Sequence, residues 1–176
     1  SEPKCPAGAT AVLGDVLDRA SFATAMSPAD VVVHLVGTPR PSPAKAAEFE
    51  AVDFVSAREC IAAARAAKVR HFVYVSVARP APVMHAYQNV RARVERLLAE
   101  SGLPHTILRP WYVLGPGHRW PYLLVPAYWL LEAIPSTRGG ARRLGLVTIR
   151  EMVEALAWSV ETAGEASRTL GVAENK

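Results

Sequence analysis

The stretch DVVVHLVG, residues Asp30 to Gly37, decides the fold class of this chain. It is a nearly continuous apolar run rich in valine. A strand that is exposed on one face alternates apolar and polar residues, whereas a strand buried on both faces reads as an unbroken run. The stretch therefore predicts a strand of a parallel sheet that is covered on both sides.

Helical patterns separate this strand from others of the same kind. Ser42 and Pro43 predict a helix start, with serine as the N-cap and proline at the first helical position. An alanine-rich stretch continues from there to about Lys68. Its larger apolar residues recur at helical spacing: Phe49, Val52, Val55 and Ile61.

The rest of the chain continues the alternation. Upstream, Ala9 to Leu13 is a short β-prone run and Arg19 to Met26 is expected to be helical. Downstream we expect strands at 71–76, 105–109, 144–148 and 169–172, with helices at 89–101 (closed by Gly102) and 150–161. Helices of crossover length between strands predict an α/β fold with a mostly parallel, Rossmann-like sheet. We read residues 1–176 as a single domain.

Composition excludes several classes of protein. Hydrophobic residues make up 51% and charged residues 20% of 176, which excludes a disordered chain. Two cysteines, Cys5 and Cys60, exclude a disulfide-stapled scaffold. The net charge of +4 comes from dispersed basic residues, so a nucleic-acid partner is not expected. Without an export signal or a disulfide framework, the expected location is cytoplasmic.

The most apolar segment is PYLLVPAYWLLEAIP, residues 121–135. It is shorter than the roughly 18 apolar residues of a membrane span, and it contains Pro126 and Glu132. No membrane span is therefore predicted. A buried helix or pocket lid and a contact with a membrane surface are the two interpretations of this segment.

Several of these pieces, in this order, resemble the short-chain dehydrogenase/reductase superfamily. The closest resemblance is to its atypical branch of NmrA-like and epimerase/dehydratase-like NAD(P)-binding proteins. The pieces that carry it are GDVLD (14–18), DVVVHLVG (30–37), FVYVS (72–76), Tyr87 with Arg91, and TILRP (106–110), with Gly115 and Gly117 just after. The resemblance implies an NAD or NADP cofactor.

In this family, an aspartate followed by an apolar residue after the third strand holds the adenine ring. The resemblance thus implies that Asp15 accepts a hydrogen bond from the adenine amino group and that Val16 packs on the ring. Local preference equally supports a turn at Asp15 and an N-cap at Asp18.

The strand end Leu35-Val36-Gly37 is expected at the carboxyl edge of the sheet, where open α/β folds bind ligands. The resemblance implies that its backbone runs under the cofactor, and Gly37 permits a close approach. The alternative is a glycine that only ends a buried strand.

Tyr87 and Arg91 are four residues apart at the start of a helix and share one face. The resemblance implies that Tyr87 is the catalytic acid or base and that Arg91 binds the nicotinamide ribose. A nearby cation is expected to lower the phenol pKa. The family pattern has lysine in place of Arg91, and arginine does not release a proton, so a proton relay through this position is in doubt.

Ser76 matches the serine-bearing strand end that orients the substrate carbonyl in catalytic members of the family. Val77 and Ala78 follow, so a second serine is missing. A strand-end serine bonded to the backbone is the competing interpretation.

The resemblance places Pro110 and Val113 beside the nicotinamide carboxamide. Residues 111–143 are expected to form a substrate region or lid insertion. Its aromatic residues favour an apolar or aromatic small-molecule substrate: Trp111, Tyr112, His118, Trp120, Tyr122, Tyr128 and Trp129. The histidines and cysteines show no metal-ligand spacing, so no metal site is predicted.

The family fold begins with a strand and a glycine-rich turn that binds pyrophosphate, and this sequence contains no G-x-G-x-x-G or G-x-x-G-x-x-G pattern. In the strand order 3-2-1-4-5-6, the Ala9–Leu13 strand then lacks a neighbour and the Asp30–Gly37 strand exposes an edge. Three arrangements are open: the sequence is part of a longer protein, the two strands pair directly, or a second chain covers the edge as in a homodimer. We predict altered pairing or association.

Two functions follow from the sequence. The first is an oxidoreductase of the atypical short-chain dehydrogenase/epimerase type with hydride transfer assisted by Tyr87. The second is a non-catalytic dinucleotide-binding sensor or assembly protein of the same fold, which the missing glycine loop, Arg91 and the single hydroxyl of Ser76 favour.

Overall fold

A parallel four-stranded sheet forms the centre of the molecule. The computed structural model of the chain describes residues 5–115, 134, 139–140, 144–164 and 166–172. The strands are β1 (Val31–His34), β2 (His71–Val75), β3 (His105–Leu108) and β6 (Arg168–Leu170), in the spatial order β1-β2-β3-β6. All three neighbouring pairs are parallel, with Val31 opposite His71 and Phe72 opposite His105. The predicted α/β fold is confirmed.

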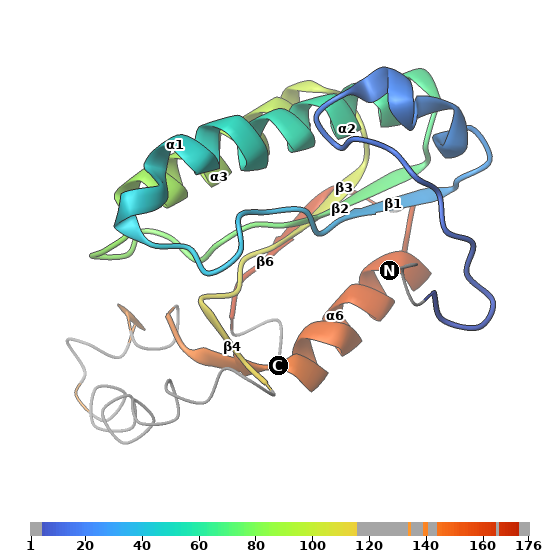
Figure 1. Cartoon of the computed structure of the whole chain (residues 1–176). Coiled ribbons are helices and arrows are strands. Elements are labelled where there is room, and N and C mark those ends of the chain that lie inside the picture. The colour runs from blue at the N-terminus through green and yellow to red at the C-terminus, as the bar shows by residue number, and fades with distance from the viewer. Residues whose placement is uncertain (1–4, 116–133, 135–138, 141–143, 165, 173–176) are drawn as a thin grey trace.

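Helices cover both faces of this sheet, as Figure 1 shows. One face carries α1 (Ala46–Glu48), a π-helical segment (Phe49–Phe54), α2 (Val55–Ala66) and α3 (His85–Glu100). The other face carries α6 (Ile149–Glu161). None of the described helices is long and apolar enough to cross a membrane.

Successive side chains of a strand point to opposite faces of the sheet and belong to two apolar clusters, one on each face. Phe72 and Tyr74 pack toward α2 and α3, whereas Val73 packs toward α6. On α3 the predicted stripe faces the first cluster, and its members Val90, Val94 and Leu98 are buried. Because β2 is covered on both sides, the four residues that follow its first residue, His71, are all apolar or aromatic: Phe72, Val73, Tyr74 and Val75.

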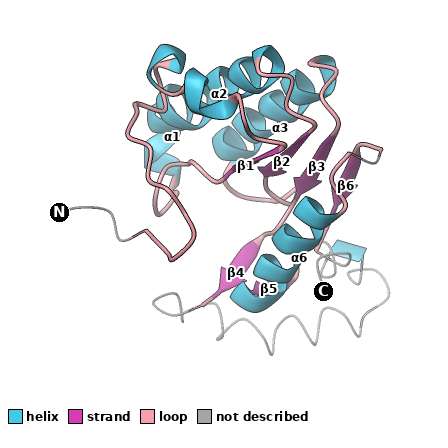
Figure 2. Cartoon of the chain, turned by 90° about the vertical axis from the view of Figure 1, so that its right-hand side faces the viewer, coloured by secondary structure: helices cyan, strands magenta, loops and turns pink. Residues whose placement is uncertain are grey.

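A second, two-stranded parallel sheet lies beside α6, apart from the main sheet (Figure 2). It pairs β4 (Tyr112–Leu114) with β5 (Leu146–Thr148). Thr148 then begins α6 through a capping box with Glu151, in which each side chain bonds the other's backbone N–H. Strand β4 was not predicted; most of the expected insertion at 111–143 lies outside the described residues.

The predicted strand at Ala9–Leu13 is wrong. These residues form no strand, and Leu13 is 82% exposed. A β-prone run becomes a strand only where a neighbour completes its hydrogen-bond ladder, and β1 pairs with β2 alone among the described strands. Direct pairing of Ala9–Leu13 with the Asp30–Gly37 strand is therefore also wrong.

The predicted helix at Arg19–Met26 is two short 3₁₀ turns, Arg19–Ser21 and Ala23–Met26. The hydroxyl of Ser21 donates to the carbonyl of Asp18 (2.7 Å) and accepts from the backbone N–H of Asp15 (2.8 Å). Such local side-chain bonds compete with regular helix formation.

Two helix starts differ from the prediction. Ser42 makes no side-chain capping bond, although Pro43 does begin the helical region as a 3₁₀ turn at Pro43–Lys45. Helix α3 begins at His85, four residues before the predicted Asn89. Its end is as predicted, because Gly102 follows the C-cap residue with a positive φ of 75°.

Candidate functional site

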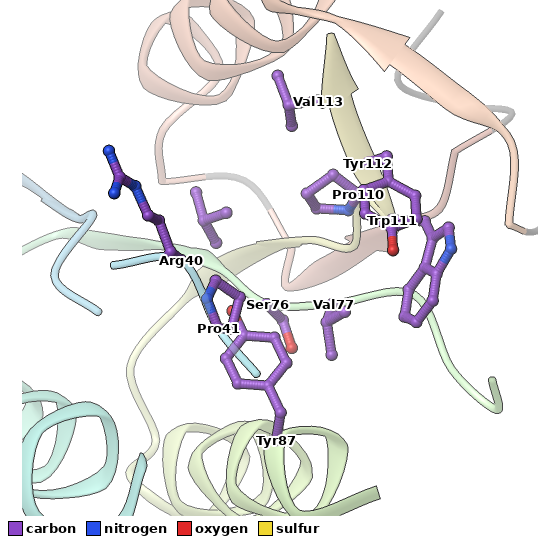
Figure 3. A pocket seen from close by; sticks show the side chains of 10 residues that line it. Arg40, Pro41, Ser76, Val77, Tyr87, Pro110, Trp111, Tyr112 and Val113 are labelled. Atoms are coloured by element: carbon purple, nitrogen blue, oxygen red, sulfur yellow. The ribbon is translucent and has the colours of Figure 1, made fainter. Parts of the chain in front are cut away.

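A cavity of about 680 Å³ lies where β2 and β3 end and the chain leads into β4. Its wall combines strand-end residues, the first turn of α3 and the segment before β4 (Figure 3). The lining residues are Arg40, Pro41, Val75, Ser76, Val77, Tyr87, Pro110, Trp111, Tyr112 and Val113. Four residues predicted for the site, namely Ser76, Tyr87, Pro110 and Val113, thus meet at the edge of the sheet where open α/β folds bind ligands.

Tyr87 reaches the cavity from the first turn of α3. Its ring packs edge-on against Phe49, with 5.0 Å between ring centroids. The guanidinium carbon of Arg91 lies 4.9 Å from the centre of the same ring, which is a cation–π distance. Figure 3 shows Tyr87 extending from the helix toward Pro41, with Ser76 beside it.

The expectation of a lowered pKa at Tyr87 is wrong. Burial raises the pKa of the Tyr87 phenol, and the nearby Arg91 charge offsets only part of that effect. The phenol therefore keeps its proton at neutral pH.

Arg91 is buried and held by three partners. Its Nη2 donates to Asp53 Oδ1 (2.6 Å), while its Nη1 donates to the Tyr74 hydroxyl (3.1 Å) and to the Val75 carbonyl (3.0 Å). The charge is thus neutralised by an acid within the fold. The Arg91 guanidinium contacts the Tyr87 ring but does not line the cavity itself.

Asp53 is the residue that sequence reasoning missed. It is fully buried in the π-helical segment, and its Oδ2 accepts hydrogen bonds from the Thr38 backbone N–H (2.9 Å) and hydroxyl (2.6 Å). Together with the Arg91 pair, this carboxylate joins the end of β1 to α3. A lone aspartate within a helical pattern carries no signal for this role, although π-helical segments often mark functional sites.

Gly37 is required for packing of the protein itself. A Cβ at this position would lie 2.6 Å from Arg91 Nη2 and 3.2 Å from Asp53 Oδ1. The missing side chain therefore makes room for the Asp53–Arg91 pair. The two interpretations of Gly37 from the sequence were close approach of a cofactor and the end of a buried strand. Neither of them predicted contact with the Asp53–Arg91 pair.

The Ser76 hydroxyl is engaged by Glu95. It donates to Glu95 Oε1 (2.5 Å), and the same buried carboxylate pairs with Arg79 and with Arg109 (2.5 Å). Burial raises the pKa of Glu95, but hydrogen bonds from Arg109, Arg79 and Ser76 outweigh it and hold that pKa below its usual value. Ser76 thus has a carboxylate partner, rather than the backbone partner that the competing interpretation had suggested.

Asp15 and Val16 lie on the exposed N-terminal segment and do not line the cavity. Asp15 Oδ1 accepts a hydrogen bond from the Leu17 backbone N–H (2.9 Å), and Asp18 caps the following 3₁₀ turn. These turn and N-cap bonds are those that local preference favours. At the end of β1, Leu35 is exposed and Val36 is half-buried.

Comparison with known proteins assigns the family. Residues 2–119, most of the chain, match the model of a family described as NAD(P)H-binding. The chain belongs to the NAD(P)H-binding family. No curated protein matches it in sequence.

Solved structures share the fold of this NAD(P)H-binding chain. WbmH of Bordetella bronchiseptica, in complex with NAD+, has a TM-score of 0.64 at 19% identity, over 90% of this chain and 58% of its own. UDP-N-acetylglucosamine 4-epimerase from Bacillus cereus has a TM-score of 0.64 at 15% identity, over 90% and 64%. MoeE5, in complex with UDP-glucuronic acid and NAD, has a TM-score of 0.65 at 22% identity, over 88% and 60%.

The expected resemblance to atypical short-chain dehydrogenase/reductase proteins is confirmed, and so is the expected NAD or NADP cofactor of the family. The chain spans about three fifths of the length of these structures. Tyr87, Pro110 and Val113, which the resemblance assigns to the nicotinamide end of such a cofactor, line one largely apolar cavity. Among the described residues, no cluster of histidine, cysteine or acidic side chains suits a metal.

Proposed function

We propose that this chain is the NAD(P)-binding part of an oxidoreductase of the atypical short-chain dehydrogenase/epimerase type, in which Tyr87 transfers the proton that accompanies hydride transfer. The observation that carries this proposal is the meeting of Tyr87 with Pro110 and Val113 around one cavity at the carboxyl edge of the sheet. We keep the cytoplasm as its expected compartment.

Each predicted residue has a distinct part in this proposal. The cofactor, when bound, supplies or accepts a hydride. Tyr87 holds a proton on its hydroxyl at neutral pH, which suits it to protonate a carbonyl oxygen during reduction. Arg91 packs against the Tyr87 ring through a cation–π contact, and Glu95 holds Ser76 at the cavity wall through a hydrogen bond.

The remaining cofactor contacts stay as predicted. Asp15 and Val16 would hold the adenine, and the strand end Leu35 to Gly37 would run beside the cofactor. The similar structure MoeE5 was solved in complex with UDP-glucuronic acid and in complex with UDP-glucose. The described wall of the present cavity is mostly apolar and aromatic, which favours an apolar or aromatic carbonyl compound as substrate.

A second function has its own support. Arg91 is committed to Asp53, and the Ser76 hydroxyl is committed to Glu95. Both residues therefore have structural partners, as expected for a dinucleotide-binding sensor or assembly protein without turnover. This alternative predicts cofactor binding and no chemistry.

Fluorescence titration with NADH and with NADPH tests binding. Saturation with either cofactor is expected, and a flat titration with both would reject the two functions together. Oxidation of the bound cofactor is then followed at its absorbance maximum with a panel of aromatic aldehydes and ketones. Turnover with any of them selects the oxidoreductase.

Tyr87→Phe tests the proton-transfer role. The variant keeps the ring that packs on Phe49 and Arg91, so cofactor affinity is expected to stay the same while turnover falls about 100-fold or more. Tyr74→Phe is the matched control, because it removes a phenol hydroxyl bound to Arg91 without removing one from the cavity. A similar loss in both variants, or none in Tyr87→Phe, contradicts the role.

A further inference from the structure

The cavity beside Tyr87 has an unbalanced charge. Among its described lining residues, Arg40 is a cation and none is an acid. The other walls are apolar or aromatic, apart from the hydroxyls of Ser76, Tyr87 and Tyr112. A cavity with one cation and low polarity attracts an anionic group more strongly than the same cation does on an open surface.

The neighbouring cations are already paired. Arg91 is neutralised by Asp53, and Arg79 and Arg109 share the carboxylate of Glu95. Arg40, in contrast, has no ion-pair partner among the residues that the structure describes. Arg40 is therefore the cation at this cavity whose charge can pair with an anionic ligand.

The backbone on the amino side of Arg40 is held by hydrogen bonds. Its φ is +50°, in the left-handed region, although it is not glycine and it precedes Pro41. On its amino side, the Thr38 backbone N–H is bonded to Asp53, and Lys45 Nζ donates to the Pro39 carbonyl (2.8 Å). A disfavoured conformation that the surroundings enforce is typical of functional positions.

We infer that Arg40 binds an anionic oxygen group, a phosphate or carboxylate, of a ligand whose flat apolar part lies against Pro110, Trp111 and Tyr87. Figure 3 shows Arg40 on one side of the cavity, with Pro110 and Trp111 across from it. A planar guanidinium bonds such groups through two parallel N–H donors. The inference rests on the proposed function, and the anion belongs either to the substrate or to the cofactor's own phosphates.

Calorimetric titration of Arg40→Gln at low salt tests this inference with two probes, phenyl phosphate and NADH. Phenyl phosphate is titrated both without NADH and with saturating NADH. Arg40 is exposed, so loss of its charge is expected to weaken binding of the affected probe only about fivefold, and 1 M salt should reduce the difference between variant and wild type. Arg40→Lys, which keeps the charge, should retain most of the affinity.

Arg65→Gln is the matched control, because Arg65 is an exposed arginine near the end of α2 and does not line the cavity. Its affinities should equal those of the wild type. Weaker phenyl phosphate binding in Arg40→Gln in the presence of NADH assigns the anion to the substrate. Weaker NADH binding, with phenyl phosphate displaced by NADH, assigns it to the cofactor.

Unchanged affinity of Arg40→Gln for both probes, or no binding of either probe to the wild type, overturns the inference. The proposed function fails separately, when the wild type binds neither NADH nor NADPH. In that case the phenyl phosphate titration without NADH still decides whether Arg40 recognises an anion.

Discussion

The groups around position 91 explain why it is an arginine rather than a lysine. The family pattern has lysine at this position, and a lysine ammonium is a point charge on a flexible stem. The arginine fork reaches Asp53, the Tyr74 hydroxyl and the Val75 carbonyl at the same time. The arginine is thus matched to a buried acid, and the pair occupies the space that Gly37 leaves open.

We predict that Asp53→Ala lowers the free energy of unfolding by about 3 kcal/mol, because it leaves the Arg91 charge buried and unpaired. Chemical denaturation measures this change. Glu50→Ala is the matched control: Glu50 also pairs with an arginine, Arg93, but both side chains are exposed, so a loss within about 1 kcal/mol is expected. Equal losses in the two variants would contradict the importance of burial.

At the scale of elements, α3 organises the candidate site. Its first turn supplies Tyr87, its second supplies Arg91, and its third supplies Glu95. Glu95 connects the end of β2, through Ser76, with Arg79 in the following loop and with Arg109 at the end of β3. Two strand ends and a loop therefore depend on one helix for their relative positions.

This arrangement predicts a pH dependence. The lowered pKa of Glu95 means that its contribution to stability is complete above its ordinary pKa of 4.5 and is lost as the pH falls through the lowered value. At pH 7, Glu95→Gln should lower the free energy of unfolding by about 2 kcal/mol. The difference from the wild type should shrink as the pH falls below 4.5.

Denaturation curves recorded from pH 7 to pH 3 measure this difference. Glu154→Gln, which removes an exposed partner of Arg150 on α6, should change stability little at any pH. A difference between Glu95→Gln and the wild type that stays constant across the range would refute the assigned role of the Glu95 carboxylate.

At the scale of the whole molecule, the main sheet has an apolar edge. Among the described strands β1 pairs only with β2, and the exposed fractions of Val33 in β1 and of Leu35 just after it are 38% and 63%. Helix α6 packs on the middle of the sheet, where Val73 and Leu108 meet Met152. An uncovered strand edge with exposed apolar side chains favours pairing with another strand.

We predict that the chain associates with itself through β1 at micromolar concentration. Sedimentation velocity should show association that increases with concentration, and Val33→Lys with Leu35→Lys should abolish it. Val153→Lys is the matched control, since Val153 is 57% exposed on α6, away from the edge. A monomer at all concentrations, or equal effects of edge and control variants, would contradict association through this edge.

Sequence patterns alone predicted those helices and strands whose residue composition reflects how deeply they are buried. Apolar runs predicted strands at 30–37, 71–76 and 105–109, and apolar residues at helical spacing predicted a helical region at 43–68. The structure has strands and helices within these ranges, because each pattern matches the periodicity and burial of its own segment. The resemblance to the family, not these patterns, placed Tyr87, Ser76, Pro110 and Val113 at the cofactor and substrate, and in the structure the four residues line one cavity.

The tertiary structure decided what depends on neighbours distant in sequence. Ala9–Leu13 has strand-like residues but no ladder partner, so it is not a strand. The pKa of Tyr87 is raised because burial outweighs a cation four residues away. Asp53 acquires its role from Thr38 and Arg91, 15 and 38 residues distant along the chain. Burial and long-range pairing arise only when the chain is folded, and here they set the chemistry of the site.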